Sequence, residues 1–173
     1  MKNISLIAAC DKNGCIGRNN KLPWKCRSEM EHFLKRVAFK PLIMGKNTCL
    51  SLYKPINSAI NYVLTSDKDF HREGFTTVNS MEEMLSIMED NIEYCVVGGE
   101  KIYKQFLELV HTRDDVHAIV ELSRMQVKVE NGDAFFPLDM LEGNDMYRTQ
   151  IIYKHNGSDM SWYVEAYYRN RIR

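Results

Sequence analysis

Four short apolar runs set the strongest limit on the fold of this chain. Each run is continuous rather than alternating, as expected for strands that are buried on both faces of a mostly parallel sheet. Stretches with helical or loop character separate the runs, and two further strand-like stretches close the chain. The four runs are ISLIAAC at 4–10, PLIMG at 41–45, NYVLTS at 61–66 and EYCVVGG at 93–99, and the closing pair spans 147–156 and 161–169.

This order of elements predicts the fold class. Strands that alternate with helices and end in a hairpin indicate an α/β fold with a mostly parallel central sheet of about eight strands. We expect an antiparallel C-terminal hairpin and about four flanking helices. The chain has 173 residues, which suits one domain, 1–173, with a substantial buried core.

Composition excludes several classes of function. Lys plus Arg and Asp plus Glu are both 23, so no overall charge attracts nucleic acid or an anionic membrane. No apolar run is long enough to cross a bilayer, and the first strand starts too near Met1 for a signal peptide. The five cysteines have no zinc-like spacing, and Cys10 and Cys95 lie inside apolar runs. We therefore expect reduced thiols, no metal and a cytoplasmic location, and we take the chain to be a monomer without nucleic-acid or membrane partners.

Two capping boxes predict helix starts. Ser28 with Glu31 three residues later predicts a helix that begins at Glu29. Ser80 with Glu83 repeats the pattern and predicts a second helix, which looks purely architectural.

The helix that begins at Glu29 carries an apolar stripe beside that carboxylate. Glu29 lies about 90° from the middle of the stripe, so it can lean over the edge of a pocket. A carboxyl group there is partly desolvated, and a raised pKa would suit proton transfer. The helix pattern alone fits an ordinary acidic residue at a helix start better, and Glu31 is nearly as good a candidate. The stripe consists of Met30, Phe33, Leu34 and Val37.

Glycines mark three places where a ligand could approach the backbone. Gly17 lies in the loop after the first strand, and Gly98 with Gly99 joins a strand to a helix. Lys46 and Thr48 follow a glycine at a second strand–helix junction, where free backbone N–H groups can hold phosphate. Simple turns and helix capping explain the same residues if each junction is taken alone.

In order, these motifs resemble those of the dihydrofolate reductase family. ISLIAACDKNGCIGRNNKLPW resembles its first strand, active-site loop and Pro-Trp turn. Glu29 is the acid five residues after Trp24, and Phe33 follows four residues later. PLIMGKNT, VVGGEKIYKQFL and GDAFFP match three further family motifs in the same order, and the resemblance covers roughly two thirds of the chain.

The resemblance implies NADPH-dependent reduction of 7,8-dihydrofolate to 5,6,7,8-tetrahydrofolate, a step of one-carbon metabolism and an antifolate target. Hydride would pass from the nicotinamide C4 to the pterin C6, while Glu29 holds the pterin and promotes protonation of N5, through water. Trp24 would order that water, although it also fits a plain core aromatic. Leu22 would belong to the loop that closes over the reacting atoms.

The remaining site residues follow from the resemblance. NADPH is preferred over NADH because Lys46, and also Lys68, are cations near the expected 2′-phosphate, and the Gly98–Gly99 peptide is expected to be cis. Ser123 stands where a family Thr hydroxyl bonds the catalytic carboxylate. The expected substrate-binding residues are Ile7, Glu29, Phe33, Leu52, Lys54, Ile56, Val97 and Ser123. The expected cofactor-binding residues are Ala9, Ile16, Gly17, Asn20, Lys46, Asn47, Thr48, Leu64, Thr65, Ser66, Gly98, Gly99, Glu100, Lys101, Ile102 and Tyr103.

The chain departs from the family pattern at the end of the substrate site. Between Pro55 and Asn61, the family Arg that pairs with the glutamate tail of folate falls on Ala59. Loss of one side of such a pair costs about 2–5 kcal/mol, so we expect at least a roughly 30-fold weaker hold on the tail. Lys54, or else Lys35 or Arg36, could reach the carboxylate, without the forked geometry of the missing Arg.

Two alternatives stay open because of this departure. The chain could reduce another pterin or pyrimidine heterocycle, or it could be a non-catalytic homologue that binds nucleotide or folate. The stretch from 108 to 121 is also longer than its family counterpart, which predicts an enlarged surface loop around Arg113 to Asp115.

Overall fold

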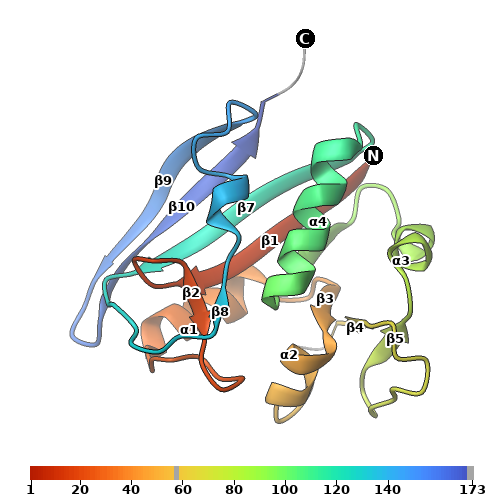
Figure 1. Ribbon diagram of the computed structural model, residues 1–173, viewed down its shortest axis with the longest axis horizontal. Helices are drawn as coiled ribbons and strands as arrows, with labels where there is room; N and C mark the ends of the chain where they lie inside the picture. Colours follow the sequence, from red (N-terminus) through yellow and green to blue (C-terminus); the bar gives the residue numbers. More distant parts are fainter. Residues whose placement is uncertain (57–58, 171–173) are drawn as a thin grey trace.

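A central eight-stranded sheet with helices on both faces forms the body of the protein (Figure 1). The structure is a computed structural model, and it describes residues 1–56 and 59–170, so Asn57 and Ser58 of the predicted tail-binding segment lie outside the described residues. The strand order is β5-β4-β3-β6-β1-β7-β10-β9. The pairs from β5 to β7 are parallel, and β10 pairs antiparallel with both β7 and β9. The predicted fold class is confirmed.

The bounds of the elements agree closely with the apolar runs. The strands of the main sheet are β1 (Lys2–Cys10), β3 (Leu42–Gly45), β4 (Asn61–Leu64), β5 (Thr76–Val78), β6 (Glu93–Val96), β7 (Val116–Met125), β9 (Tyr147–Asn156) and β10 (Ser161–Arg169). A small second sheet pairs β2 (Cys15–Gly17) with β8 (Ala134–Phe135). The helices are α1 (Arg27–Arg36), α2 (Lys46–Ser51), α3 (Met81–Ile87), α4 (Glu100–Thr112) and the 3-10 helix η1 (Leu138–Met140).

Strand β1 explains why the apolar runs are continuous. Successive side chains of a strand point to opposite faces. On one face, Ile4 and Leu6 pack in the core layer that contains α4, as Figure 1 shows for the ribbon. On the other face, Ile7 packs in the layer with Val37, beside α1. Both faces of the strand are therefore covered. If apolar and polar residues alternated along it, polar side chains would lie in one of the two core layers, so the run has to be continuously apolar.

The structure confirms one capping box and contradicts the other. Ser80 precedes α3, and its side chain accepts a hydrogen bond from the backbone N–H of Glu83, as the pattern predicts. Ser28, by contrast, lies inside α1, which begins two residues earlier than predicted, at Arg27 with Cys26 at the N-cap position. The prediction for Ser28 is wrong because this hydroxyl binds partners outside its own helix.

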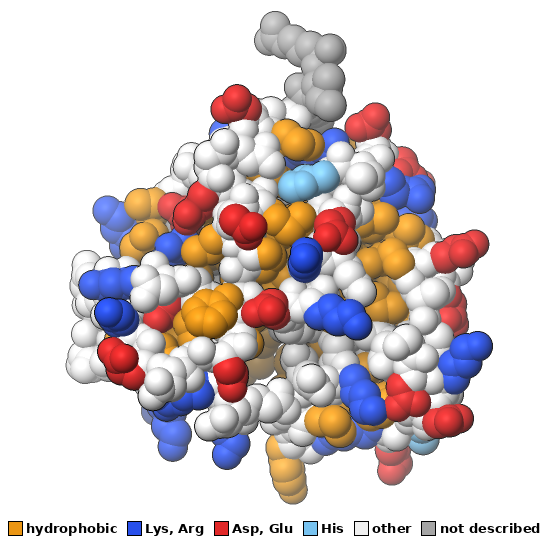
Figure 2. All heavy atoms as spheres, in the orientation of Figure 1, with side chains coloured by type: hydrophobic (Ala, Val, Ile, Leu, Met, Phe, Trp, Pro, Cys, Tyr) orange, Lys and Arg blue, Asp and Glu red, His pale blue; other side chains and the backbone are white. Residues whose placement is uncertain are grey.

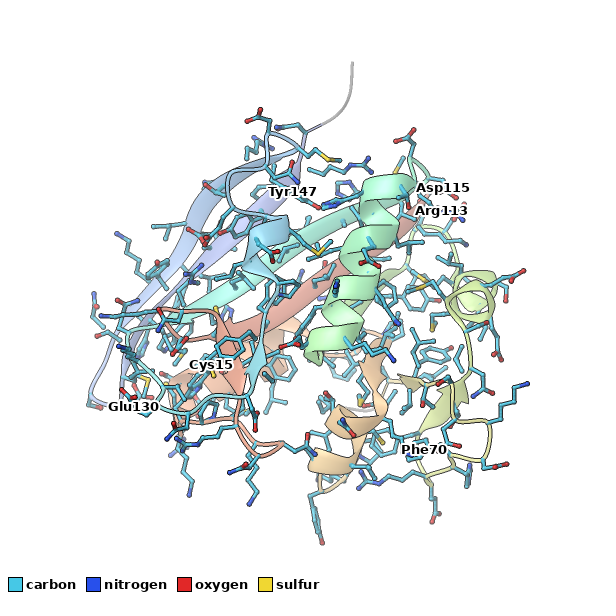
Figure 3. All side chains as sticks on the ribbon, viewed as in Figure 1. Cys15, Phe70, Arg113, Asp115, Glu130 and Tyr147 are labelled. Atoms are coloured by element: carbon cyan, nitrogen blue, oxygen red, sulfur yellow. The ribbon has the colours of Figure 1, made fainter. Side chains whose placement is uncertain are left out.

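The connection between α4 and β7 is also shorter than predicted. Helix α4 continues to Thr112 and β7 starts at Val116, so only 113–115 joins them and the enlarged surface loop is wrong. Arg113 and Asp115 close this turn with hydrogen bonds of 2.8 and 2.7 Å between guanidinium and carboxylate (Figure 3). Residues 108–112 belong to the helix and 116–121 to the strand.

A buried carboxylate holds the loop after β1. Asp11 is 0% exposed, and its two oxygens accept hydrogen bonds from the backbone N–H groups of Asn13, Cys15 and Val129, each at 2.8 Å. These contacts join β2 to the segment that follows β7. All five cysteines are buried and free of disulfides. No helix in residues 1–56 and 59–170 is long and apolar enough to cross a membrane.

We predict that Asp11→Ala lowers the free energy of unfolding by about 3 kcal/mol, because three backbone N–H groups lose a fully buried acceptor and one of these bonds is itself buried. Urea denaturation measures this change. Asp139→Ala, which removes an exposed carboxylate from η1, is the matched control and should change stability by less than about 0.5 kcal/mol. Equal effects of the two substitutions would contradict this account of Asp11.

Candidate active site

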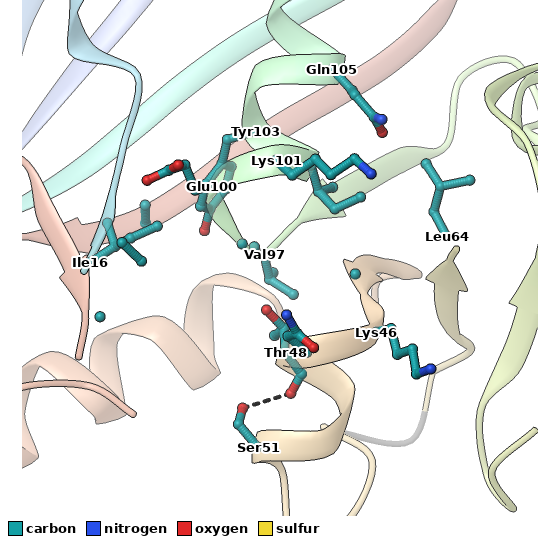
Figure 4. A pocket seen from close by; sticks show the side chains of 18 of the residues that line it. Ile16, Lys46, Thr48, Ser51, Leu64, Val97, Glu100, Lys101, Tyr103 and Gln105 are labelled. Atoms are coloured by element: carbon teal, nitrogen blue, oxygen red, sulfur yellow. Dashed lines mark hydrogen bonds between the residues drawn. The ribbon is translucent and has the colours of Figure 1, made fainter. Parts of the chain in front are cut away.

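A cleft of about 1310 Å³ opens at the carboxyl ends of β1, β3, β4 and β6 (Figure 4). Helices α1 and α2 contribute one wall and α4 the other. In open α/β sheets, ligands bind at this edge. On the face of the molecule drawn in Figure 2, basic and acidic side chains are interspersed with apolar ones, so neither sign of charge dominates that face.

Most residues predicted from sequence to form the site line this cleft. Trp24, Lys54 and Ser123 are the predicted residues that do not contribute to its lining. Those that do are Ile7, Ala9, Ile16, Gly17, Asn20, Leu22, Glu29, Phe33, Lys46, Asn47, Thr48, Leu52, Ile56, Leu64, Thr65, Ser66, Val97, Gly98, Gly99, Glu100, Lys101, Ile102 and Tyr103. Residues far apart in the sequence are therefore brought to one place, as the motif order predicts.

Glu29 is the buried carboxyl group of the cleft. It lies in the first turn of α1, and its side chain is only 5% exposed. Burial raises the pKa of Glu29 from 4.5 to about 7, and a hydrogen bond from the Ser123 hydroxyl partly offsets this rise. Ser123 on β7 is itself buried, so the hydroxyl and the carboxyl group meet away from bulk water. The alternative carboxylate, Glu31, is exposed and pairs with Arg27 at 3.0 Å.

The apolar stripe of α1 divides between core and cleft. Val37 is fully buried and Phe33 packs against the same core layer. Met30 and Leu34 are 40% and 46% exposed and line the cleft, so the four residues of the stripe do not all face the core. These two side chains remain exposed because the cleft, rather than another element, lies opposite them.

Trp24 lies next to this region, in a cluster with Cys26, Met125 and Trp162. Its indole Nε1 is buried, and no described residue accepts a hydrogen bond from it. A buried donor without a protein partner is uncommon and marks a place for a polar ligand or water. Trp24 therefore has features of both interpretations. Its ring packs against a buried cluster, as a core aromatic does, while its N–H has no partner among the described residues and could bind water.

The other end of the cleft has the features of a nucleotide site. Helix α4 begins after Gly99, and no described side chain caps its first turn, so its backbone N–H groups and the positive end of its dipole are available to a ligand. The Gly98–Gly99 peptide is cis, as predicted. A Cβ atom at Gly98 would lie 3.3 Å from Thr48 Oγ1, and Gly98 has φ +124°, so a side chain there would be strained and crowd the cleft.

Three lysines line the cleft, and one of them already has a partner. Lys46 Nζ lies 2.8 Å from the Asp67 carboxylate and 5.4 Å from the centre of the Phe70 ring. Lys21 and Lys101 are the other two lining cations. The free α4 N-terminus, the glycine backbone and these cations fit an anionic dinucleotide better than a neutral ligand.

The loop after β2 contacts both walls of the cleft. Asn20 Nδ2 donates to the backbone oxygen of Asn47 at 3.1 Å, at the start of α2. On the other side, the backbone N–H of Asn19 donates to Asp133 Oδ2 at 2.9 Å. Asp133 lies directly before β8, so the small β2–β8 sheet and the Asn20 bond hold this loop beside the cleft.

None of the three cations suggested for a carboxylate tail lines the cleft. Arg36 is half-buried and binds Glu93 at 2.6 Å and Glu121 at 2.7 Å, so its guanidinium is already paired with carboxylates of the sheet. Lys35 and Lys54 are exposed. The end of the cleft near Leu52 and Ile56 is therefore apolar.

Sequence reasoning missed several lining residues. Met30 and Leu34 were recognised as part of an apolar stripe but were not predicted to be site residues. Gln105 follows Lys101 by four residues on α4, and that spacing places both on one helix face (Figure 4). Asp133 lies within the GDAFFP motif, and its place at the cleft depends on pairing between distant strands.

A family model described as "Dihydrofolate reductase" matches residues 3–167. The dihydrofolate reductase of Neisseria gonorrhoeae is 34% identical over 152 residues, which cover 87% of this chain and 89% of the relative. The dihydrofolate reductase of Haemophilus influenzae is 32% identical over 133 residues, with 77% and 78% covered. That of Bacillus subtilis is 36% identical over 100 residues, with 58% and 60% covered.

We predict that Glu29→Gln stabilises the protein in a pH-dependent way. Because the folded-state pKa of Glu29 is about 7 and its ordinary value is 4.5, the stability that its proton provides is complete below pH 4.5 and is lost as pH rises through 7. Gln does not ionise, so the stability of the variant relative to wild type should rise by about 3 kcal/mol from pH 4.5 to pH 8. Thermal unfolding across this range measures the difference, and a pH-independent difference would show that Glu29 titrates normally.

Proposed function

Because this chain belongs to the dihydrofolate reductase family, we propose that it reduces 7,8-dihydrofolate to 5,6,7,8-tetrahydrofolate with NADPH. The observation that carries the proposal is the buried Glu29 carboxyl group, bonded by Ser123, at the floor of a cleft whose other end suits a dinucleotide. A carboxyl group that titrates near neutrality is suited to supply a proton at physiological pH.

Glu29 has two tasks in this proposal. Its carboxylate accepts hydrogen bonds from the pyrimidine edge of the pterin, which fixes the ring in the cleft. Its proton then reaches N5 through a water molecule, since a pKa of about 7 keeps the protonated form well populated at neutral pH. The unpaired indole N–H of Trp24 supports a role for that residue in ordering this water.

The cofactor end has a separate set of residues. Bound NADPH supplies the hydride. The first turn of α4, after Gly98 and Gly99, would hold its phosphates, with Lys101 and Thr48 nearby in the lining. The Tyr103 hydroxyl donates a 2.7 Å hydrogen bond to the Ile7 backbone oxygen, which fixes this side chain in the lining of the cleft. The loop of Leu22, which closes one side of the cleft, would exclude water from the reacting atoms.

We further propose that Lys46 provides the preference for NADPH over NADH. Lys46 and Asp67 are both about 40% exposed, so their pair is accessible to a ligand. Thr65 and Ser66 line the cleft next to Asp67 in the sequence. A 2′-phosphate carries more charge than a carboxylate and would compete for the ammonium group.

We predict that Lys46→Ala weakens binding of NADPH by about tenfold and that of NADH by less than about twofold, because only NADPH loses a charge-assisted hydrogen bond. Quenching of tryptophan fluorescence measures both dissociation constants. Lys68→Ala is the matched control, since Lys68 is exposed and does not line the cleft. Equal losses for the two nucleotides would remove Lys46 as the source of the preference.

A second candidate substrate is favoured by the apolar end of the cleft. With Ala59 in place of the family Arg, none of the cations considered for the folate tail belongs to the described lining of the cleft. The same site could then reduce a dihydropterin that lacks the glutamate tail.

We predict that purified protein oxidises NADPH with dihydrofolate and with a tail-less dihydropterin, with KM values that differ by less than about tenfold. Absorbance at the nicotinamide band measures turnover.

Glu29→Gln should bind NADPH normally but lose at least about 100-fold in hydride transfer at neutral pH. Binding of NADPH without turnover of either substrate would favour a non-catalytic homologue, and a strong preference for dihydrofolate would mean that another cation holds the tail.

A further inference from the structure

The first turn of α1 has no cap from its own N-cap residue. Cys26 occupies that position and makes no side-chain cap hydrogen bond to the turn. The first backbone N–H groups of a helix need acceptors outside the helix. Glu29 lies in this same turn, so its position depends on how the turn is held.

Asp159, in the turn between β9 and β10, supplies the missing acceptor. Its Oδ2 accepts hydrogen bonds from the Ser28 backbone N–H at 3.0 Å and from the Ser28 hydroxyl at 2.7 Å. Cys26 Sγ lies 3.4 Å from the same oxygen. Asp159 Oδ1 accepts from the Met160 backbone N–H at 2.8 Å, which fixes the carboxylate within its own turn.

Trp162 completes the attachment from the same hairpin. Its indole Nε1 donates to Ser28 Oγ at 3.0 Å, so the hydroxyl that donates to Asp159 also accepts from β10. The Trp162 ring contacts His32 on α1 at 5.2 Å and stacks on His155 at 5.3 Å, measured between ring centroids. The last strand pair therefore holds the start of α1 by both polar and aromatic contacts.

We propose that Asp159 is a positioning residue for Glu29, which it holds in its buried seat by capping the helix turn that carries both Ser28 and Glu29. Asp159 itself is 131 residues from Ser28 and lies outside the cleft lining. Its role in the reaction rests on the proposed function, but its effect on Glu29 can be measured without substrate.

The charges around the cap agree with this role. Hydrogen bonds from Ser28 and Met160 hold the pKa of the Asp159 carboxyl well below its usual range, so it stays an acceptor at any working pH. His155 Nε2 lies 3.2 Å from Asp159 Oδ1, the oxygen that does not bind Ser28. A carboxylate at a helix N-terminus is also favoured by the helix dipole.

The test is a titration of the Glu29 carboxyl group by NMR, in protein labelled with ¹³C at the Glu δ-carbon. Wild type should titrate near the expected value of about 7. In Asp159→Ala the first turn loosens and Glu29 reaches water, so its midpoint should move at least about half a pH unit toward acid. Asp159→Asn keeps an acceptor that caps helices equally well and should stay within about 0.2 of wild type.

Two controls separate positioning from general stability. Asp145→Ala removes an exposed carboxylate just before β9 and should leave the Glu29 midpoint unchanged. Circular dichroism at the titration temperature shows whether each variant is folded. If Asp159→Ala is not folded, Ser28→Ala replaces it, and its Glu29 midpoint should shift in the same direction.

Two results would overturn the proposal. A wild-type midpoint in folded Asp159→Ala would reduce Asp159 to a stabilising residue, and an equal shift in Asp159→Asn would show that charge rather than the cap controls Glu29. In turnover, Asp159→Ala should lower kcat at pH 7 at least about twofold with the KM for NADPH unchanged, because the acid shift lowers the protonated fraction of Glu29. Because the titration needs neither substrate nor cofactor, a wild-type protein without reductase activity would refute the proposed function alone.

Discussion

The burial of one carboxyl group, that of Glu29, is the constraint to which the rest of this structure is fitted. Removing a carboxylate from water costs free energy. A site that keeps one buried therefore has to supply hydrogen-bond partners and fix the element that carries it. Ser123 supplies the direct contact from β7. The helix that carries Glu29 is held at its start by the terminal hairpin and at its end by Arg36, which binds Glu93 and Glu121 on the sheet.

The sheet can bury Glu29 because β1 lies near the centre of the strand order. Helices cover both faces of β1, and its pairing with β6 ends at Leu6, short of its carboxyl end, where residues of α1, α2 and α4 line the opening. The cleft is thus a consequence of the strand order, and its two ends differ in chemistry. One end presents α4 backbone and lysines, while the other is apolar around Leu52 and Ile56.

Local patterns allowed much of this to be predicted. The continuous apolar runs predicted the buried strands, and the Ser80 capping box predicted α3. Both patterns involve only residues that are close together in the sequence. The capping box at Ser28 failed for the opposite reason, since Ser28 binds Asp159, 131 residues later. Met30 and Leu34 were not predicted to line the cleft, because periodicity identifies an apolar face but not whether a core or a cavity lies opposite it. Arg36 likewise looked available until its partners on β6 and β7 were known.

The bond between Asp159 and Ser28 also bears on how the chain folds. A contact across 131 residues closes a very long loop. Closing such a loop costs conformational entropy, so contacts of this kind form late in folding. During synthesis, β9 and β10 leave the ribosome after the other described strands, so the first turn of α1 is capped only once this hairpin has emerged. A nascent chain that stops short of the hairpin could assemble the α4 side of the sheet, yet Glu29 would not be held in position.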